Sequence, residues 1–345
     1  MFENKDKTEI DKLGEFGLIN YLTKNIEINN LSTLKGVGDD AAVLNFEGKK
    51  TLISTDLLLD GIHFDLAYTP LKHLGYKAIQ VNLSDIYAMN GTATQVTVSL
   101  GFSSKFPLEA VEELYEGMML ACKKYNVDIV GGDTTSSRQG LVISVTSIGY
   151  ADEQEICYRN TANEGDLICV SGDLGGAYLG LQLLEREKQI FLENPKIQPD
   201  LEGKDYIVER QLKPEARRDI VLLLKDLKVK PTAMIDISDG LSSEVIHICV
   251  GSEKGCNLYE DKIPLDPMTY ETAREFNLDP TVCALSGGED YELLFTVAQS
   301  DYPKIQNNPD ITVIGHITDK ASGMNLISKS GAVHPLKAQG WNSFK

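Results

Sequence analysis

The spacing of apolar residues along the chain predicts helices and strands in alternation. In residues 107–125, Val111, Leu114 and Met118 recur at spacings of three and four, which predicts an amphipathic helix. Residues 95–101 alternate between polar and apolar side chains and predict a strand. The same patterns predict further helices over 15–24, 70–89, 177–187, 214–228, 241–251, 267–277 and 300–307. They also predict strands over 41–46, 51–56, 127–130, 141–150, 167–171, 233–237, 290–298 and 311–318.

Turn-forming residues set the limits of several elements. Glu47-Gly48 predicts a hairpin between the two strands that flank it. Pro70 lies in the first turn of the helix over 70–89, and Asn90-Gly91 follows its end. The polar, proline-containing segment 188–205 predicts a loop or an insertion, and we assign it no role.

The order of elements predicts two domains. The first part of the chain combines helices with paired strands, which is typical of an α+β layer with helices on one sheet face. The polar stretch 159–166 reads as the crossing into a second α/β domain. We therefore expect a two-domain α+β and α/β protein with domains at 1–158 and 159–345.

Charge and composition narrow the classes of partner. The chain has 345 residues, of which 42% are hydrophobic and 24% charged, and its formal net charge is −18. Such an acidic protein lacks the basic surface that non-specific nucleic-acid binding needs, and it would not be drawn to an anionic membrane. It can still bind phosphorylated substrates where metal ions reverse the local field.

The cysteines and the apolar runs indicate a reduced, cytoplasmic protein. None of the six cysteines lies two residues from another, so the sequence has no zinc knuckle and no redox dithiol. Most of them lie in apolar surroundings, which predicts small buried side chains. The charged start of the chain has no signal core, and no run approaches the roughly 20 apolar residues of a membrane span.

Aspartates recur in five short polar segments. Four of them are predicted to lie where a strand ends: Gly38–Asp40, Ser54–Asp56, Gly131–Asp133 and Asp236–Gly240. The fifth, Asn82–Asp85, lies in a predicted helix. Gathered in one cleft, such carboxylates would repel each other unless cations lay between them. Oxygen ligands that leave room for water and phosphate suit Mg²⁺, so the pattern indicates phosphoryl transfer. Taken singly, each strand-end segment is about as readily a turn or a helix cap.

The helical segment is the most informative of the five. Asn, Ser and Asp compete for backbone hydrogen bonds and are poor residues for a helix interior. Asn82 and Asp85 nevertheless lie among apolar neighbours, and their spacing of three places them on one face. A binding site accounts for them better than a polar stripe facing solvent.

Glycine-rich turns supply further candidates. Gly131–Thr135 combines close backbone approach with a carboxylate, Ser171–Gly176 is a possible phosphate-facing turn, and Ser286–Glu292 is a candidate binding edge. The chain has no glycine-lysine phosphate loop, no protein-kinase catalytic loop and no serine nucleophile elbow.

Six segments in this order resemble the thiamine-monophosphate kinase family, and the resemblance runs from about residue 14 to residue 341. They are GVGDDAAV, ISTDLLLDGIHF, AIQVNLSDIYAMN, IVGGDTT, AMIDISDGLSSE and ALSGGEDYELLF. The family belongs to the superfamily of aminoimidazole-ribonucleotide synthetases. The resemblance implies a two-domain α/β fold, and a homodimer formed through the N-terminal domain.

The resemblance also implies a reaction and a set of site residues. The reaction is ATP + thiamine monophosphate → thiamine diphosphate + ADP, with several Mg²⁺ ions and no protein nucleophile. The implied Mg²⁺ ligands are Asp40, Ser54, Thr55, Asp56, Asp85, Asp133, Asp236 and Asp239. His63, Glu289 and Trp341 are implied to contact thiamine monophosphate, and Gly132, Arg159, Ser238 and Tyr115 to meet ATP.

Two alternatives stay open from the sequence. One is another ATP-using enzyme of the same superfamily, although the first cysteine, Cys122, lies on a predicted helix and not in a glycine-rich N-terminal segment, and the chain ends without a cysteine tail. The other is a nucleotide or metal sensor that keeps the carboxylates without turnover.

Overall fold

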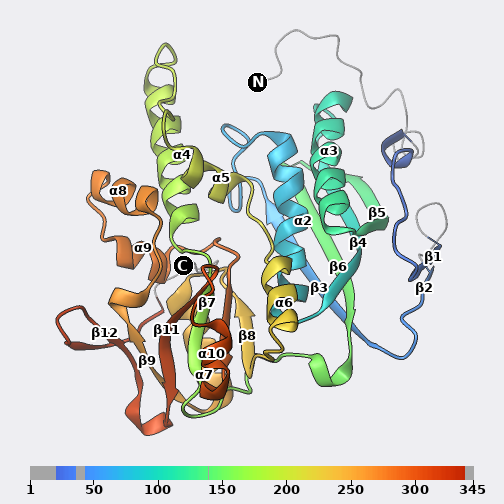
Figure 1. The fold of residues 1–345 in the computed structure, drawn as a ribbon. Helices are drawn as coiled ribbons and strands as arrows, with labels where there is room; N and C mark the ends of the chain where they lie inside the picture. Colours follow the sequence, from blue (N-terminus) through green and yellow to red (C-terminus); the bar gives the residue numbers. More distant parts are fainter. Residues whose placement is uncertain (1–20, 36–42, 139, 339–345) are drawn as a thin grey trace. The chain divides into compact units, whose positions relative to one another are not determined.

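The computed structural model of the protein describes residues 21–35, 43–138 and 140–338 (Figure 1). The chain divides into two compact units. Unit 1 comprises Met1–Ile86 and Gly91–Gln154, and unit 2 comprises Tyr87–Asn90 and Glu155–Lys345. Each unit has its own sheet and is described by itself.

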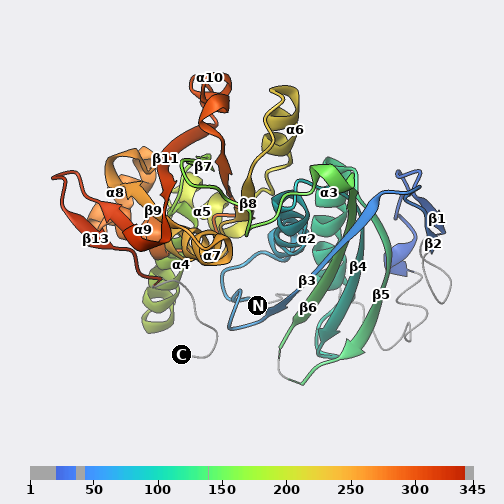
Figure 2. The ribbon, with the colours of Figure 1, turned by 90° about the horizontal axis from the view of Figure 1, so that it is seen from below.

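Unit 1 contains a four-stranded sheet in the order β3-β6-β4-β5. Its strands are β3 (Lys50–Leu59), β4 (Thr92–Phe102), β5 (Asp128–Ser136) and β6 (Val142–Ala151). β6 pairs antiparallel with β3 and β4, while β4 and β5 are parallel. Figure 2 shows α2 (Leu71–Ala88) and α3 (Leu108–Tyr125) side by side over one face of this sheet.

The two long predicted helices of unit 1 are confirmed. Asn90 adopts a left-handed conformation with φ 58° just after α2, as the predicted helix end requires. Of the helix predicted over 15–24, residues 21–23 are helical and the earlier part lies outside the described residues.

α2 and α3 approach each other at two glycines. A Cβ atom on Gly75 would lie 1.9 Å from the carbonyl oxygen of Leu114, and one on Gly117 would lie 1.9 Å from that of Lys72. Since neither position has room for a side chain, backbone meets backbone at this crossing.

The predicted hairpin around Glu47-Gly48 is wrong. β2 (Val43–Leu44) pairs with β1 (Thr33–Lys35), and β3 pairs over its full length with β6. A ten-residue ladder with β6 satisfies the backbone groups of β3 far better than a two-residue partner can.

Two aspartate segments lie inside strands and not at strand ends as predicted. β3 continues past Asp56 to Leu59, and β5 continues through Gly131–Asp133 to Ser136. The parallel ladder with β4 carries β5 across the double glycine that normally indicates a strand end.

Unit 2 contains a seven-stranded mixed sheet in the order β13-β12-β9-β11-β7-β10-β8. The strands are β7 (Leu167–Ser171), β8 (Ala233–Asp236), β9 (Gly255–Tyr259), β10 (Leu293–Val297), β11 (Ile311–Thr318), β12 (Met324–Ile327) and β13 (Val333–Pro335). The predicted strands at β7, β8, β10 and β11 are confirmed. β9, β12 and β13 were not predicted.

The helices of unit 2 agree only in part with those predicted from the sequence. They are α4 (Gly176–Glu193), α5 (Asp205–Leu212), α6 (Arg218–Asp226), α7 (Leu241–Ser252), α8 (Pro267–Glu275), α9 (Pro280–Ser286) and α10 (Tyr302–Ile305). The predicted loop over 188–205 is wrong at its start, because α4 continues to Glu193. The helix predicted over 214–228 begins only at Arg218, and neither α5 nor α9 was predicted.

All six cysteines are free and buried, as predicted. Within the described ranges, the structure has no helix with the length and apolar character needed to span a membrane.

Candidate functional site

The structure brings Ser54, Asp56 and Asp85 together between β3 and α2. The hydroxyl of Ser54 donates to Oδ2 of Asp85 at 2.5 Å. Asp56 lies two residues from Ser54 in β3, so both side chains point to the face that α2 covers. Three of the predicted cation ligands therefore share one place in unit 1.

Asn82 accounts for the polar stripe inside α2. Its side chain is fully buried, and its Oδ1 accepts from the amide of Asp56 at 3.0 Å. Its Nδ2 donates to the carbonyl of Ala78 at 2.9 Å, and its own carbonyl accepts from the hydroxyl of Ser147 at 2.9 Å. Asn82 thus ties α2 to β3 and β6 beside the carboxylates.

The two carboxylates lie in a place that disfavours negative charge. Burial raises the pKa of Asp56 to about 6, and repulsion from Asp85 adds to the shift. Burial also raises the pKa of Asp85, although the hydrogen bond from Ser54 opposes this. A cation between them would offset both burial and repulsion.

Thr55 points to the opposite face of the sheet. It lies between Ser54 and Asp56 in β3, and its exposed side chain donates to the carbonyl of Val145 at 3.0 Å. The structure therefore separates the side chain of Thr55 from those of its two neighbours.

Asp133 lies on the same face as Thr55. Across the sheet it pairs with Ser99, which pairs with Ser144, which pairs with Leu57. Paired residues point to one face, and the side chain of Asp133 is exposed there. It is not brought to Asp85.

Three further residues of unit 1 were predicted to contact a substrate: Gly132, His63 and Tyr115. A Cβ on Gly132 would lie 1.9 Å from the carbonyl oxygen of Val98, so strand packing alone requires this glycine. Nδ1 of His63 accepts from the amide of Leu59 at 3.1 Å, which fixes the orientation of the ring. Burial raises the pKa of Tyr115 to about 12.

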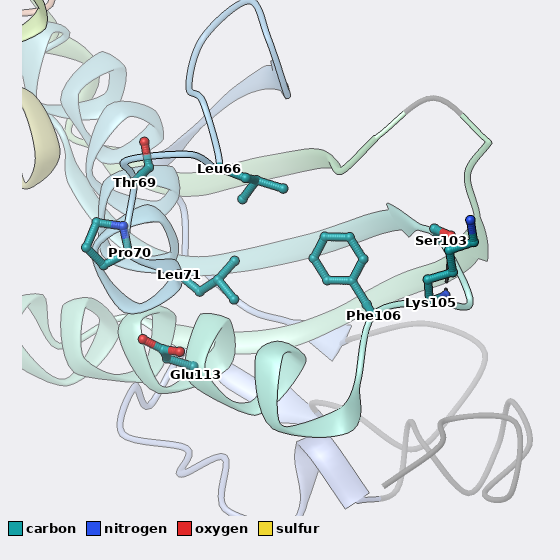
Figure 3. Close-up of a pocket in the computed structure, with 8 residues that line it drawn as sticks. All are labelled: Leu66, Thr69, Pro70, Leu71, Ser103, Lys105, Phe106 and Glu113. Atoms are coloured by element: carbon teal, nitrogen blue, oxygen red, sulfur yellow. Dashed lines mark hydrogen bonds between the residues drawn. The ribbon is translucent and has the colours of Figure 1, made fainter. Parts of the chain in front are cut away.

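Unit 1 also has a pocket of about 470 Å³ near the start of α2 and of α3. Figure 3 shows the apolar side chains of Leu66, Leu71 and Phe106 around it, with Lys105 and Glu113 at its edge. Leu71 lies 14 residues before Asp85, or roughly 20 Å along the helix axis. The pocket is therefore separate from the carboxylates.

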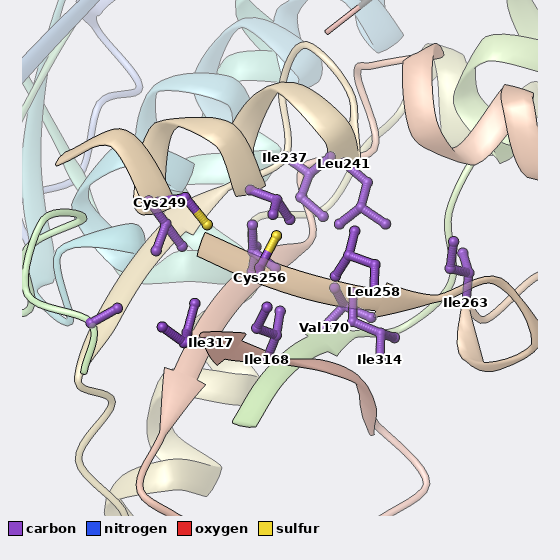
Figure 4. Packing of buried hydrophobic residues seen from close by; sticks show 14 of the residues in the cluster. Ile168, Val170, Ile237, Leu241, Cys249, Cys256, Leu258, Ile263, Ile314 and Ile317 are labelled. Atoms are coloured by element: carbon purple, nitrogen blue, oxygen red, sulfur yellow. The ribbon is translucent and has the colours of Figure 1, made fainter. Parts of the chain in front are cut away.

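In unit 2, Asp236 is the last residue of β8, and Ser238 and Asp239 lie in the turn that leads to α7. The turn is anchored by Ile237 and Leu241, which are fully buried in the core that Figure 4 shows. The amide of Glu289 donates to the carbonyl of Ser238 at 2.7 Å. The structure thus brings Glu289 to the turn.

Sequence reasoning missed Glu244, in the first turn of α7. Its Oε1 accepts from the amide of Asp239 at 3.0 Å, and only 2% of the residue is exposed. Burial raises its pKa to about 8, with repulsion from Asp239 and Asp236 as lesser causes. An acid that reaches back from the first turn of a helix is a capping signal that the sequence contains.

Replacing Glu244 by Gln is expected to stabilise the protein at pH 8. The raised pKa means that the contribution of Glu244 to stability is fully present below about pH 4.5 and is lost as the pH rises to about 8. Gln keeps the acceptor oxygen without the charge, so the gain should be on the order of 2–4 kcal/mol at pH 8 and vanish near pH 4.5. Urea unfolding in EDTA at both values measures it, with exposed Glu271→Gln as control. Equal midpoints at pH 8 would contradict the expectation.

Two acids of the segment Ser286–Glu292 lie in buried ion pairs. Glu292 accepts from Arg210 at 2.8 Å and also pairs with Arg217, while Asp290 lies 3.6 Å from Arg210. Asp290 also accepts from the amide of Gly175 at 2.8 Å, just before α4. The carboxylate of Asp290 therefore binds an amide of Ser171–Gly176, the turn that was predicted as a possible phosphate site.

The remaining predicted residues are not brought to either cluster by any described contact. Arg159 is exposed in unit 2, and Asp40 and Trp341 lie outside the described residues. Among the residues that the structure describes, no three His, Cys, Asp or Glu side chains lie close enough to hold a metal ion. A cation at Asp56 and Asp85 would need further oxygen ligands, such as water or phosphate.

Comparison with known proteins shows which family this chain resembles. Residues 38–151 match the family described as AIR synthase related protein, N-terminal domain. The thiamine-monophosphate kinase of Bacillus subtilis (strain 168) is 32% identical over 96% of this chain and 100% of its own. That of Aquifex aeolicus (strain VF5) is 34% identical over 97% of this chain and 99% of its own.

A solved structure described as AaThiL complexed with AMPPCP and TMP is also similar. It has a TM-score of 0.73 and 31% identity, and the match covers 99% of this chain and 100% of that one. The two-domain, mixed α/β fold of the AIR synthase type is thereby confirmed. The chain belongs to the thiamine-monophosphate kinase family of phosphotransferases.

Proposed function

We propose that the protein transfers the γ-phosphoryl group of ATP to thiamine monophosphate, giving thiamine diphosphate and ADP. We further propose that the transfer is direct and in line, assisted by several Mg²⁺ ions. The observation that carries the proposal is the cluster of Ser54 and Asp56 on β3 with Asp85 on α2, where Asn82 links the helix to the strand. The cluster lies in a chain that matches thiamine-monophosphate kinases over nearly its full length.

The donor set fits Mg²⁺. Asp56 and Asp85 are hard oxygen ligands, and burial and mutual repulsion raise the pKa of Asp56. Ser54 adds a neutral oxygen beside Asp85. When bound, Mg²⁺ supplies positive charge that reduces the repulsion between the two anionic reactants.

The chain itself needs to supply little covalent chemistry. An oxygen of the thiamine monophosphate phosphate attacks the γ-phosphorus, and the bond from that phosphorus to the bridging β–γ oxygen breaks as ADP leaves. The attacking oxygen is already ionised near neutral pH, so neither a protein nucleophile nor a general base is required. The protein's part is to position the reactants and to surround them with charge.

The remaining roles follow the family pattern and are proposals. Mg²⁺ ions would be held by Asp40, Ser54, Asp56, Asp85, Asp236 and Asp239 and, on the opposite face of the unit 1 sheet, by Thr55 and Asp133. Thiamine monophosphate would be contacted by His63, Glu289 and Trp341, and ATP by Gly132, Arg159, Ser238 and Tyr115. Domain 1–158 would bind ATP and Mg²⁺ and form the dimer, domain 159–345 would be the C-terminal α/β domain, and the protein would work in the cytoplasm.

A homodimer through unit 1 is supported by apolar side chains on one face of its sheet that the described residues of the chain leave exposed. Ile53 and Leu57 point to the face opposite α2 and are 68% and 51% exposed. An exposed apolar sheet face of this kind is typical of an interface, and we propose a second copy of the chain as its occupant.

Ile53→Asp is expected to dissociate that dimer. A charge at the centre of an apolar interface should weaken association by roughly 100-fold or more. Sedimentation velocity at micromolar concentration measures it. Val250, 64% exposed on α7, gives the matched control Val250→Asp. A wild-type protein that is monomeric at these concentrations would contradict the proposal.

One assay tests the reaction. Purified protein is incubated with Mg·ATP and thiamine monophosphate, and both thiamine diphosphate and ADP are quantified. Equal amounts of the two products support the proposal. ADP formed only with another acceptor would indicate a different enzyme of the superfamily, and nucleotide binding without turnover would indicate a sensor.

A further inference from the structure

Helix α5, which the sequence did not reveal, holds all three acids of the segment Glu289–Glu292. Arg210 lies 2.8 Å from Glu292 and 3.6 Å from Asp290. The next residue, Gln211, donates from Nε2 to Oε2 of Glu289 at 2.8 Å. Two consecutive side chains of one short helix thus reach three acids that lie far along the sequence.

The backbone of this segment is strained. Glu289 and Tyr291 adopt left-handed conformations, with φ of 58° and 52°, which side-chain-bearing residues avoid. The amides of both are held by the turn after β8: Glu289 by the carbonyl of Ser238 at 2.7 Å and Tyr291 by that of Ile237 at 2.8 Å. Strain of this kind persists where the surroundings hold it, and it concentrates at functional sites.

The two holding side chains differ in charge. Arg210 forms ion pairs, which cancel charge on Asp290 and Glu292. Gln211 is neutral and only 4% exposed, so its hydrogen bond fixes the carboxylate of Glu289 without cancelling its charge. The thiazolium ring of thiamine carries a permanent positive charge, which such a carboxylate would attract.

We propose that Gln211 is a positioning residue for the acceptor substrate: it aims the Glu289 carboxylate at the cationic part of thiamine monophosphate. This inference rests on the proposed function, in which Glu289 contacts that substrate. It gives α5 a role in acceptor selectivity.

Kinetics with each substrate varied separately test the inference. Gln211→Met keeps the side-chain length but removes the donor, and should raise KM for thiamine monophosphate on the order of tenfold. KM for ATP should stay within about twofold, since a merely structural defect would not single out one substrate. Gln211→Asn, too short to reach Glu289, should behave alike. Gln306→Met, the same change just after α10, serves as matched control.

A double-mutant cycle tests whether Gln211 acts through Glu289. In a Glu289→Gln background, Gln211→Met should raise KM for thiamine monophosphate no further. Additive effects, or equal rises in KM for both substrates, would overturn the inference while the reaction itself stands. A wild-type protein without turnover would overturn the proposed function. Calorimetric binding of thiamine monophosphate to wild type and Gln211→Met would then decide the inference: equal affinities, or no binding at all, would sink it.

Discussion

Asp85→Asn is expected to abolish turnover while the fold stays intact. Asn has the same shape and can still accept the hydrogen bond that Ser54 donates at 2.5 Å. It removes one of the two negative charges that a cation between α2 and β3 would need. Since the proposed reaction depends on metal charge, kcat/KM should fall on the order of 10³-fold or more. The coupled assay for ADP measures the loss, and circular dichroism checks the fold.

Asp152→Asn is the matched control, because that aspartate is exposed in unit 1. Its activity should equal that of the wild type. Higher Mg²⁺ concentrations should recover part of the lost activity if Asp85 acts by binding the metal. Wild-type turnover in Asp85→Asn would refute the metal role of this residue.

Arg210→Met is expected to cost about 3–5 kcal/mol of unfolding free energy. Its side chain is 15% exposed, whereas the side chains of Glu292 and Asp290 that it contacts are 1% and 0% exposed. Removing the cation leaves buried negative charge with only partial compensation from Arg217 and from the amide of Gly175. Urea unfolding at pH 7.5 measures the loss.

The critical comparison also removes the charge of Glu292, the ion-pair partner of Arg210. Arg210→Met combined with Glu292→Gln should be more stable than Arg210→Met alone, because the second change removes the uncompensated carboxylate. Arg274→Met, an exposed arginine on α8, should leave the midpoint unchanged. If the single and double variants unfold at the same midpoint, the charge of Glu292 is not what Arg210 compensates.

The cluster on α2 could be predicted from the sequence because polar residues inside an apolar helix are unfavourable unless an interaction holds them there. Asn82 is fully buried and bonded to β3, as a site residue would be. The long helices α2 and α3 could be predicted from their spacing, since many residues repeat one pattern. Short elements such as β9 and α9 offer too few residues for a pattern to appear.

Side-chain direction in the sheet was out of reach without the strand register. The prediction placed Asp133 at a strand end, but β5 runs through it, and the pairing with Ser99 sends its side chain to the face that bears Thr55. The role of Gln211 was equally hidden. Gln211 depends on a contact across 78 residues, and nothing local marks its partner.

The crossing of α2 and α3 makes the site sensitive to changes far from it. α2 is a stiff rod, and Asp85 lies ten residues, or about 15 Å along the axis, from Gly75. A methyl group added at Gly75 or Gly117 would push the rods apart at the crossing and tilt α2, which moves its far end most. The position of the Asp85 carboxylate thus depends on the absence of a side chain at Gly75 and at Gly117, and Gly117 lies on the other helix, α3. Gly117→Ala would therefore affect the chemistry of a site on the other helix as well as the packing of the fold.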